Sequence, residues 1–315
     1  MNSSVVLMPN WIGDMLLALS IVERLPERRR LKTTLLVPGQ MSGLVSLLSD
    51  LPRIEFARAD ADEMKRTVQG VRSRGFDTMY LLPFSFSSAW FGMKTGVPVR
   101  RGLSLEMRRF LLTEPLSGNL RDKSSHITHE YAKILDTPYS PPEEWIGKTV
   151  MPDRSHAGSI VFCPGAIYGP AKKWRHFPEL ALLKERDKIV ILGKPEDRES
   201  AMEIVRMAPG RITDLTGKTS LTEAASIMAG ARAVVSNDSG LMHLAAFIGT
   251  PVIGLFGSTS PIWTRPLGKR SIAMNFPEPC APCFDRKCRY GHYRCLENIT
   301  PNIVAEAMEK LCNSN

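Results

Sequence analysis

Residues 233–257, AVVSNDSGLMHLAAFIGTPVIGLFG, decide the fold class of this chain. An apolar, β-branched run ends at Ser236, a polar turn follows at 237–240, and a helical pattern begins at Leu241. A second apolar run occupies 251–257. Continuous apolar runs of this length are typical of strands buried on both faces of a parallel sheet, and parallel neighbours need a crossover, usually a helix. The stretch therefore predicts a β-α-β unit of an α/β domain.

The same alternation extends over the rest of the chain. Further apolar runs that predict strands lie at 4–8, 32–37, 78–83, 159–163 and 188–193. Amphipathic segments separate most of them, so both halves are predicted to be doubly wound α/β domains. Residues 136–159 are rich in proline, serine and charge and predict the linker. We expect an N-terminal domain at 1–155, a C-terminal domain at 156–299 and a final helix at 300–315.

Composition limits the classes of function. The 315 residues carry a formal net charge of +9, spread over both halves, which either favours anionic partners or is ordinary surface charge. The first residues lack the basic segment of a secretory signal, and no apolar run approaches the roughly 20 residues that span a bilayer. We expect a cytoplasmic protein, in which clustered cysteines favour metal binding or burial over disulfides.

The polar turn at 237–240 predicts a phosphate site. Ligands of open parallel sheets bind beyond the carboxyl ends of the strands, and a helix N-terminus offers free N–H groups to an anion. Gly240 allows close approach of the backbone, Ser239 can donate a hydrogen bond, and Asp238 either caps the helix or accepts from a ribose hydroxyl. His243, one turn into the helix, either faces the ligand or lies in the core.

Two other strand-to-helix loops carry candidate residues. In CPGAIYGPAKKW, Gly165 opens the loop and Lys172 stands where a helix would begin, as a counter-charge for a diphosphate or as a surface lysine. In NWIGD, Gly13 and Asp14 lie in the first helical turn, where a carboxylate suits a catalytic base or an N-cap. A cleft between the two domains would bring the base and the phosphate site together.

The sequence does not match the common nucleotide-binding and hydrolase motifs. The stretch TGKTS resembles the end of a Walker A loop, but Ile212 stands where that loop needs glycine. Ser220 and Glu223 predict a capping box instead. No G-x-G-x-x-G follows the first strand and no G-x-S-x-G elbow is present. Kinases, dinucleotide dehydrogenases and serine hydrolases of the common types are therefore unsupported.

Four separated motifs together resemble the lipopolysaccharide heptosyltransferases of glycosyltransferase family 9, of the heptosyltransferase II type. The resemblance implies the GT-B architecture, with two Rossmann-like domains that face a cleft. It implies an acceptor in the N-terminal domain, ADP-heptose in the C-terminal domain, and a final helix that packs back towards the N-terminal domain. The motifs are NWIGDMLLALSIVERL, YLLPFSFSSAWFGMKTGVPVRRGLSLEMRR, CPGAIYGPAKKW and SNDSGLMHLAAFIGTPVIGLFGSTSP.

The reaction implied by this resemblance moves L-glycero-D-manno-heptose from ADP-heptose onto the heptosyl-Kdo2-lipid A inner core. It proceeds with inversion and needs no metal or other cofactor in catalysis. Another acceptor or another nucleotide sugar within the same family is the alternative. A sugar-nucleotide sensor without catalysis is a more distant one.

The family residues carry over to positions of this sequence. Asp14 matches the aspartate of the W-x-G-D motif and would be the general base. Lys172 matches the lysine before the K-x-W tryptophan and would neutralise the departing diphosphate. The donor loop D-[TS]-G-x-x-H matches Asp238, Ser239, Gly240 and His243, with serine in place of the family threonine.

An acidic residue that contacts the donor in relatives matches Glu196, Asp197 or Glu199. Spacing does not decide among them, and Glu199 is taken as the donor-binding candidate together with Gly13 and Gly165.

The basic segment 94–110 is a candidate acceptor site. Arg100 and Arg101 would meet the anionic core sugars or the inner face of the inner membrane, with a solvated helix face as the alternative. This predicts a lipid A–Kdo–heptose partner and a peripheral location on that membrane.

The stretch PCAPCFDRKCRYGHYRC contains four cysteines, with His292 as a substitute ligand. Spacings of two, four and six residues allow one tetrahedral site but match no standard finger. We predict a structural zinc site, with reduced thiols or a disulfide as alternatives. A nucleic-acid partner is not expected, because a zinc knuckle leaves the paired α/β domains unexplained. The cysteines are Cys280, Cys283, Cys288 and Cys295, within a Cys-rich loop at 279–297.

Overall fold

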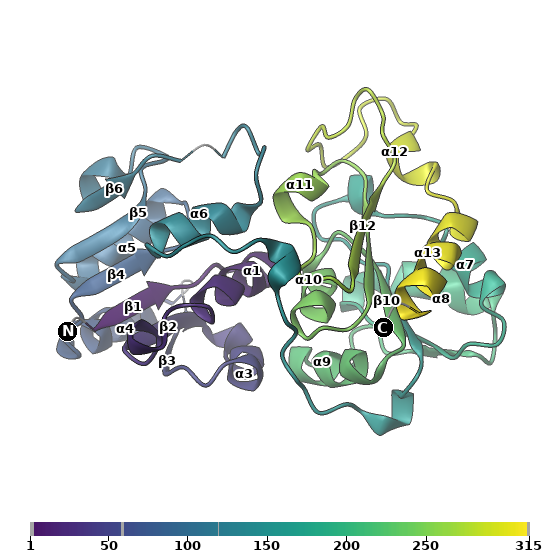
Figure 1. The fold of residues 1–315 in the computed structure, drawn as a ribbon, viewed down its shortest axis with the longest axis horizontal. Helices are drawn as coiled ribbons and strands as arrows, with labels where there is room; N and C mark the ends of the chain where they lie inside the picture. Colours follow the sequence, from purple (N-terminus) through teal and green to yellow (C-terminus); the bar gives the residue numbers. More distant parts are fainter. Residues whose placement is uncertain (1–2, 58–59, 119, 314–315) are drawn as a thin grey trace. The chain divides into compact units, whose positions relative to one another are not determined.

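The computed structural model describes residues 3–57, 60–118 and 120–313. The chain divides into two compact units, Met1–Ser140 and Pro141–Asn315. Each unit contains one six-stranded parallel sheet with helices, which confirms the predicted α/β class (Figure 1). No helix in the described part of the chain is long and apolar enough to cross a membrane.

The first unit builds its sheet in the order β3-β2-β1-β4-β5-β6. Its strands are β1 (Ser4–Leu7), β2 (Thr33–Pro38), β3 (Arg53–Phe56), β4 (Thr78–Leu81), β5 (Val99–Leu103) and β6 (Glu114–Leu116). Its helices are α1 (Ile12–Val22), α2 (Glu27–Arg30), α3 (Gly39–Leu48), α4 (Ala61–Ser73), α5 (Phe86–Thr95), α6 (Ile127–Ile134) and the 3-10 helix η1 (Arg109–Leu111).

The second unit builds its sheet in the order β12-β11-β10-β7-β8-β9. Its strands are β7 (Ile160–Cys163), β8 (Ile189–Ile191), β9 (Ile212–Asp214), β10 (Ala233–Asn237), β11 (Val252–Phe256) and β12 (Ser271–Asn275). Its α-helices are α7 (Phe177–Leu183), α8 (Arg198–Met207), α9 (Leu221–Gly230), α10 (Gly240–Phe247), α11 (Pro261–Thr264), α12 (Arg294–Glu297) and α13 (Pro301–Asn313). Its 3-10 helices are η2 (Pro142–Glu144), η3 (Arg154–His156), η4 (Pro170–Lys172) and η5 (Pro195–Asp197).

Both sheets follow the same winding rule. In each unit the first strand pairs with the fourth, β1 with β4 and β7 with β10, and the later strands add outward on the two sides. The connections reverse direction at this pair of strands, and such a switch point leaves a crevice at the carboxyl ends of the strands where ligands bind. We therefore expect the functional residues in the loops after β1 and β4 and in the loops after β7 and β10.

The central strands of the second unit are buried on both faces. Alternate residues of β7, such as Ile160 and Phe162, pack into a cluster with α7, α8 and α13, which lie together on one side of the sheet in Figure 1. Val161 is equally buried, and α9 and α10 pack together as a second group of helices. This double coverage explains the unbroken apolar runs by which the sequence revealed these strands.

The division between the units differs from the predicted boundary near residue 155. Segment 141–155 belongs to the second unit, because Trp145 is buried there against Phe247, with ring centroids 4.6 Å apart. Its indole Nε1 donates to the carbonyl of Phe247 over 2.8 Å. Gly147 passes so close to Gly249 that a Cβ on Gly147 would lie 2.3 Å from the Gly249 Cα. A proline-rich segment that reads as a linker is thus anchored by one tryptophan.

The predicted C-terminal helix is present as α13. Val304, Met308 and Leu311 form its apolar face and join the core cluster of the second unit. The helix packs on α7 and on β11. Its approach to the N-terminal domain stays a prediction.

Candidate active site

An ion pair joins the two loops at the switch point of the second sheet. The ammonium of Lys172, in the loop after β7, lies 2.5 Å from Oδ2 of Asp238, at the end of β10. The side chain of Asp238 is 4% exposed and that of Lys172 is 13% exposed. The hydroxyl of Thr259, after β11, donates to the same carboxylate oxygen over 2.6 Å. Asp238 is therefore neither a helix cap nor free; it holds a lysine in place.

Backbone contacts determine where Lys172 lies. Its loop forms the 3-10 turn η4, in which the N–H of Ala171 donates to the carbonyl of Arg286 over 3.1 Å. Gly169 has φ of +144°, and a Cβ at that position would lie 2.4 Å from the same carbonyl oxygen. Only glycine permits this approach and this conformation without strain. The ammonium also lies 4.9 Å from the ring centroid of Tyr168, a cation–π contact.

Asn237 holds the two loops together from beneath. Its Nδ2 donates to the carbonyl of Pro164 over 2.7 Å, and its Oδ1 accepts from the N–H of Trp174 over 3.1 Å. Both contacts are buried, so the loops after β7 and β10 are rigidly joined.

The helix that follows Asp238 presents its positive end to this region. Ser239 is the N-cap of α10 and makes no side-chain capping bond, so it leaves the first-turn N–H groups uncapped by its hydroxyl. Gly240 is the first residue of α10, and both residues are half-buried. His243 is buried one turn further. Asp238, the partner of Lys172, directly precedes this N-cap, so an ammonium and the first-turn N–H groups of α10 belong to one loop region. Both kinds of group can bind an anion.

The three candidate carboxylates after β8 lie differently. Glu196 and Glu199 are exposed, whereas Asp197 is half-buried and folds back towards Gly165. A Cβ on Gly165 would lie 2.1 Å from Oδ2 of Asp197. Asp197 also accepts from the N–H of Lys194 over 3.0 Å. Of the three, Asp197 is therefore the residue beside the predicted donor loop.

The Cys-rich loop at 279–297 packs against the loop of Lys172. The N–H of Phe284 donates to the carbonyl of Ser258 over 2.7 Å, and the carbonyl of Phe284 accepts from the hydroxyl of Tyr168. The guanidinium of Arg286 lies 5.5 Å from the centroid of the Tyr168 ring. Together with the bond from Ala171 to Arg286, these contacts make the loop a support for the lysine.

The four cysteines of this loop are free thiols that line one small cavity with Tyr293. Burial and then the charges of the other three raise the pKa of Cys295 to about 11. Burial raises the pKa of Cys288, but backbone N–H groups of residues 290–293 outweigh it and lower that pKa. No group of three or more His, Cys, Asp or Glu side chains in the described ranges is arranged to hold a metal ion. The structure therefore does not show the predicted zinc site.

In the first unit, Asp14 lies in the first turn of α1, directly after the loop that follows β1, and is half-buried beside Gly13. The helix N-terminus stabilises a carboxylate at this position. Helix α6 packs against α1 and contributes Tyr131, which is 1% exposed. Burial and the charge of Asp14 raise the pKa of Tyr131 well above its usual value, so this phenol stays protonated.

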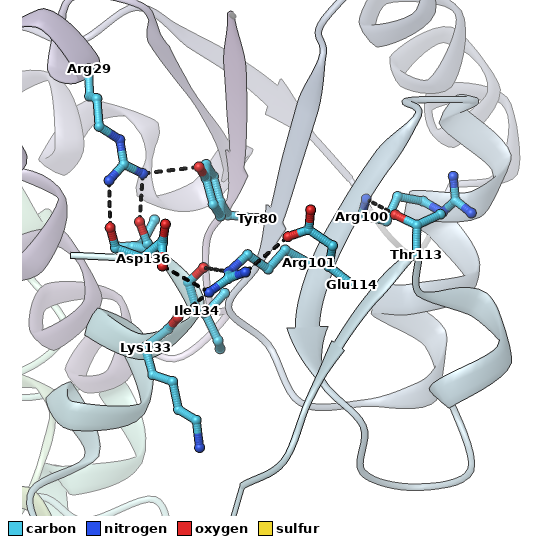
Figure 2. A network of polar contacts seen from close by, with 10 residues as sticks. Arg29, Tyr80, Arg100, Arg101, Thr113, Glu114, Lys133, Ile134 and Asp136 are labelled. Carbon is cyan, nitrogen blue, oxygen red and sulfur yellow. Dashed lines mark hydrogen bonds and ion pairs between the residues drawn. The ribbon is translucent and has the colours of Figure 1, made fainter.

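Helix α6 is held from its C-terminal end by two arginines, as Figure 2 shows. Arg101 donates to the carbonyl of Ile134 over 3.0 Å and pairs with the carboxylates of Glu114 and Asp136 at 2.9 and 3.1 Å. Arg29 donates to the carbonyls of residues 135 and 136 and to the hydroxyl of Tyr80. Cations at a helix C-terminus complement its dipole.

Arg100 has intramolecular partners too. Its Nε donates to the carbonyl of Leu111 over 3.0 Å and its Nη1 to that of Val97 over 2.7 Å. Both arginines therefore have a structural role that the sequence did not reveal. Their predicted contact with the acceptor stays a prediction.

Arg108, in the same basic segment, is the largest fully buried side chain among the described residues. It donates to the carbonyls of Leu103, Pro83 and Ser85 at 2.6, 2.6 and 3.0 Å. Burial lowers its pKa to about 10. The residue fixes the loop between β4 and α5, at the switch point of the first sheet.

Comparison with known proteins decides the family. The model of glycosyltransferase family 9 (heptosyltransferase) matches residues 64–294, well over half of the chain. The chain belongs to glycosyltransferase family 9. It is a glycosyltransferase, as predicted.

Among similar sequences, lipopolysaccharide heptosyltransferase 2 of Escherichia coli K12 is 29% identical over 343 residues, covering 97% of both chains. Lipopolysaccharide heptosyltransferase 1 of Pseudomonas aeruginosa PAO1 is 27% identical over 246 residues, covering 72% of this chain and 67% of its own. The solved structure of E. coli ADP-heptose lps heptosyltransferase II superposes with a TM-score of 0.82 at 26% identity, covering 98% of both chains. E. coli heptosyltransferase WaaC with ADP-2-deoxy-2-fluoro heptose superposes with a TM-score of 0.72 at 20% identity, covering 98% of this chain and 99% of its own. The predicted GT-B fold class is confirmed.

Sequence reasoning missed several residues that build the predicted donor region of this family 9 enzyme. Thr259 and Tyr168 contact Asp238 and Lys172, and Asn237 joins their loops. One signal was available for Thr259, since it follows the carboxyl end of β11, next to the switch point. No sequence signal pointed to Tyr168, because Phe284, which accepts the hydrogen bond of its hydroxyl, lies 116 residues further along the chain.

Proposed function

We propose that this family 9 enzyme moves L-glycero-D-manno-heptose from ADP-heptose to the first heptose of heptosyl-Kdo2-lipid A, with inversion at the anomeric carbon. The observation that carries the proposal is the Lys172–Asp238 pair beside the N-terminus of α10. A diphosphate needs cations and N–H donors at one point, and a switch point of a parallel sheet supplies them. The names of the heptosyltransferase 2 relatives support the sugar and the acceptor.

The donor unit stabilises the leaving group. Lysine has three N–H donors, and Asp238 uses one of them, so two remain for diphosphate oxygens. The carboxylate fixes the ammonium before substrate arrives, which makes the site preorganised for the negative charge that develops as ADP leaves. Ser239 and Gly240 add N–H groups, and His243 lies one turn further along the same helix. Because these groups already supply positive charge, the proposed step needs no cofactor.

Asp14 is the proposed general base. The acceptor oxygen attacks the anomeric carbon and its proton passes to the Asp14 carboxylate. The electron pair of the breaking anomeric C–O bond leaves with ADP. A position in the first turn of α1 keeps the carboxylate ionised, which a base requires. Burial and then the charge of Asp14 raise the pKa of Tyr131 well above its usual value, so the phenol beside this helix does not compete as a base.

The nucleoside end of the donor is assigned to the Gly165 loop. Asp197 is favoured over Glu196 and Glu199 as the acceptor of a ribose hydroxyl bond, because it alone of the three is half-buried beside Gly165. Gly13 is proposed to let the sugar approach the backbone of the first turn of α1.

The acceptor is proposed to be the anionic, lipid-linked inner core at the inner face of the inner membrane, where the enzyme acts as a peripheral protein. Arg100 and Arg101 were the predicted contacts, and their structural bonds leave less of each guanidinium for a ligand. Nucleic acid is not a proposed partner.

A structural zinc ion is proposed for Cys280, Cys283, Cys288 and Cys295. Their shared cavity and the N–H groups that lower the pKa of Cys288 support it. The thiols would have to draw closer on binding, as metal and folding are coupled in such loops. Metal analysis of the purified enzyme tests this, and a metal-free protein with full activity overturns it.

The activity itself is tested with purified enzyme, ADP-heptose and defined acceptors. We expect ADP release and a product heavier by one heptose with heptosyl-Kdo2-lipid A, and neither with Kdo2-lipid A or with a UDP-linked sugar. Transfer to Kdo2-lipid A would identify a heptosyltransferase I instead. No ADP release with either acceptor would overturn the proposal. In cells, deletion of the gene should truncate the core after one heptose.

A further inference from the structure

Helix α5 of the first unit has an apolar side that the described residues leave partly exposed. Phe86, Trp90 and Met93 are spaced by four and three residues, which places them on one side of the helix. All three are exposed, Trp90 by 42%. The other side is buried through residues such as Ala89 and Phe91. A surface helix normally places polar residues opposite its buried side, so α5 is unusual in being apolar on both.

The neighbouring segment extends this surface. Phe110, in η1, is 72% exposed, and its ring lies 6.1 Å from that of Phe86. Met107 is 84% exposed. We call the five residues Phe86, Trp90, Met93, Met107 and Phe110 the aromatic face. Helix α5 and η1 are in contact, and exposed apolar side chains gathered on adjoining elements mark a protein or membrane interaction site.

Basic side chains border the aromatic face. Lys94 lies with its ammonium 5.0 Å from the centroid of the Trp90 ring, and Arg109 is exposed between the two apolar residues of the neighbouring segment. Arg72 donates to the carbonyl of Lys94 over 2.8 Å at the end of α5, followed by exposed Arg74. The nearby acidic residue Glu106 accepts from the N–H of Phe86 over 3.1 Å. Its negative charge is therefore directed at the N-terminus of α5.

We propose that the aromatic face docks on an anionic phospholipid bilayer. Aromatic and methionine side chains enter the interface, while lysine and arginine heads remain at the level of the phosphates. The basic border fits a negatively charged surface better than a second copy of this chain. Two copies docked through this face would bring the positive charges of Lys94 and Arg109 close to the same charges of the other copy. The inference deepens the proposed function, because docking would deliver the enzyme to a lipid-linked acceptor, but the docking itself is measured without any substrate.

Co-sedimentation with vesicles tests the proposal. The full-length enzyme should bind vesicles of phosphatidylethanolamine that contain phosphatidylglycerol, and bind phosphatidylcholine alone much more weakly. Trp90→Ser with Phe110→Ser, and separately Lys94→Glu with Arg109→Glu, should each lower the partition coefficient at least about tenfold. The matched controls are Ile146→Ser, an exposed apolar residue of the second unit, and Arg186→Glu with Lys188→Glu; both should bind like wild type.

Fluorescence quenching localises the contact. Bromine-labelled lipid should quench wild-type tryptophan emission, and Trp90→Phe should remove most of that quenching, although the chain has five tryptophans. Equal vesicle binding by all variants, or quenching that survives Trp90→Phe, overturns the proposal. So does a wild-type dimer that the same substitutions turn into a monomer. Transfer to a delipidated acceptor should be unchanged in Trp90→Phe. If the wild-type enzyme shows no transfer while vesicle binding follows the expected pattern, only the proposed function is refuted.

Discussion

The Nζ atom of Lys172 lies 2.5 Å from Oδ2 of Asp238, and both belong to loops that leave the sheet at its switch point. Two residues 66 positions apart are thereby combined into one polar unit. The lysine supplies charge and the aspartate fixes its direction. In the proposed mechanism, Lys172 is therefore the group that binds the ligand and Asp238 is the group that positions it.

Asp238→Asn should lower kcat/KM for ADP-heptose by about 100-fold, because a mostly buried ammonium loses its charge partner and its fixed position. Thr259→Val removes only a neutral hydrogen bond to the same carboxylate and should cost less than about tenfold. Steady-state kinetics with varied donor measures both. Equal losses in the two variants would contradict the proposed role of the ion pair.

Asp14→Ala should leave ADP-heptose binding nearly intact and lower turnover by several orders of magnitude, since the proposed base acts only on the acceptor hydroxyl. Calorimetric titration of donor and single-turnover transfer give the two quantities. Asp50→Ala, an exposed aspartate of the same unit, is the control and should be silent. Wild-type turnover in Asp14→Ala would remove this residue from the mechanism.

Gly165→Ala should weaken donor binding, because the new methyl group would lie 2.1 Å from the carboxylate of Asp197 and must displace it. The same clash should lower the stability of Gly165→Ala. Adding Asp197→Ala to this variant should restore the stability, but the donor KM should stay raised. Gly70→Ala is the matched control: its Cβ meets nothing within 4 Å inside α4, and the change should stabilise the protein by about 0.5–1 kcal/mol. Thermal melts and donor titrations distinguish these outcomes.

Arg101→Ala should destabilise the first unit by about 2 kcal/mol, because two carboxylates and the end of α6 lose a guanidinium that is 19% exposed. Arg28→Ala, at an exposed site on α2, should not. Chemical denaturation measures the difference. A selective rise in acceptor KM with unchanged stability would instead support the predicted acceptor contact.

Asp153→Asn should reduce stability near neutral pH but not in acid. Hydrogen bonds from Ser155 and then His156 hold the pKa of Asp153 at about 2, below the ordinary value of 3.8. A carboxyl with a lowered folded-state pKa stabilises the protein above its unfolded pKa, and this contribution is lost as pH falls through the folded value. The difference in melting temperature between wild type and variant should therefore be constant above about pH 5 and narrow towards pH 2. A difference that grows in acid would contradict the assignment.

The central strands could be predicted because they are buried on both faces and therefore consist of apolar residues without interruption. The strands that the sequence did not reveal are short or lie near sheet edges: β3, β5, β6, β9 and β12. In β5, the residues Arg100 and Arg101 interrupt any apolar pattern, because their side chains bond to segments beside the strand. An edge position needs no apolar run, so it leaves no periodic signal.

The candidate site divides in the same way. Asp14, Lys172 and Asp238 could be found from the sequence, because each follows a predicted strand and the carboxyl ends of parallel strands carry the ligand sites. Three further features depend on segments far apart in the chain and could not be predicted. They are the bond between Lys172 and Asp238, the position of Asp197 beside Gly165, and the hydrogen bond from Arg101 to the end of α6.

Local pattern was enough for the fold class, the family resemblance and the loops that bear function, since burial and helix-end chemistry act over a few residues. The tertiary structure alone determined which groups the charged side chains of those loops contact. A charged side chain reaches several ångströms in any direction, and only the packed backbone determines which carboxylate, carbonyl or solvent it meets.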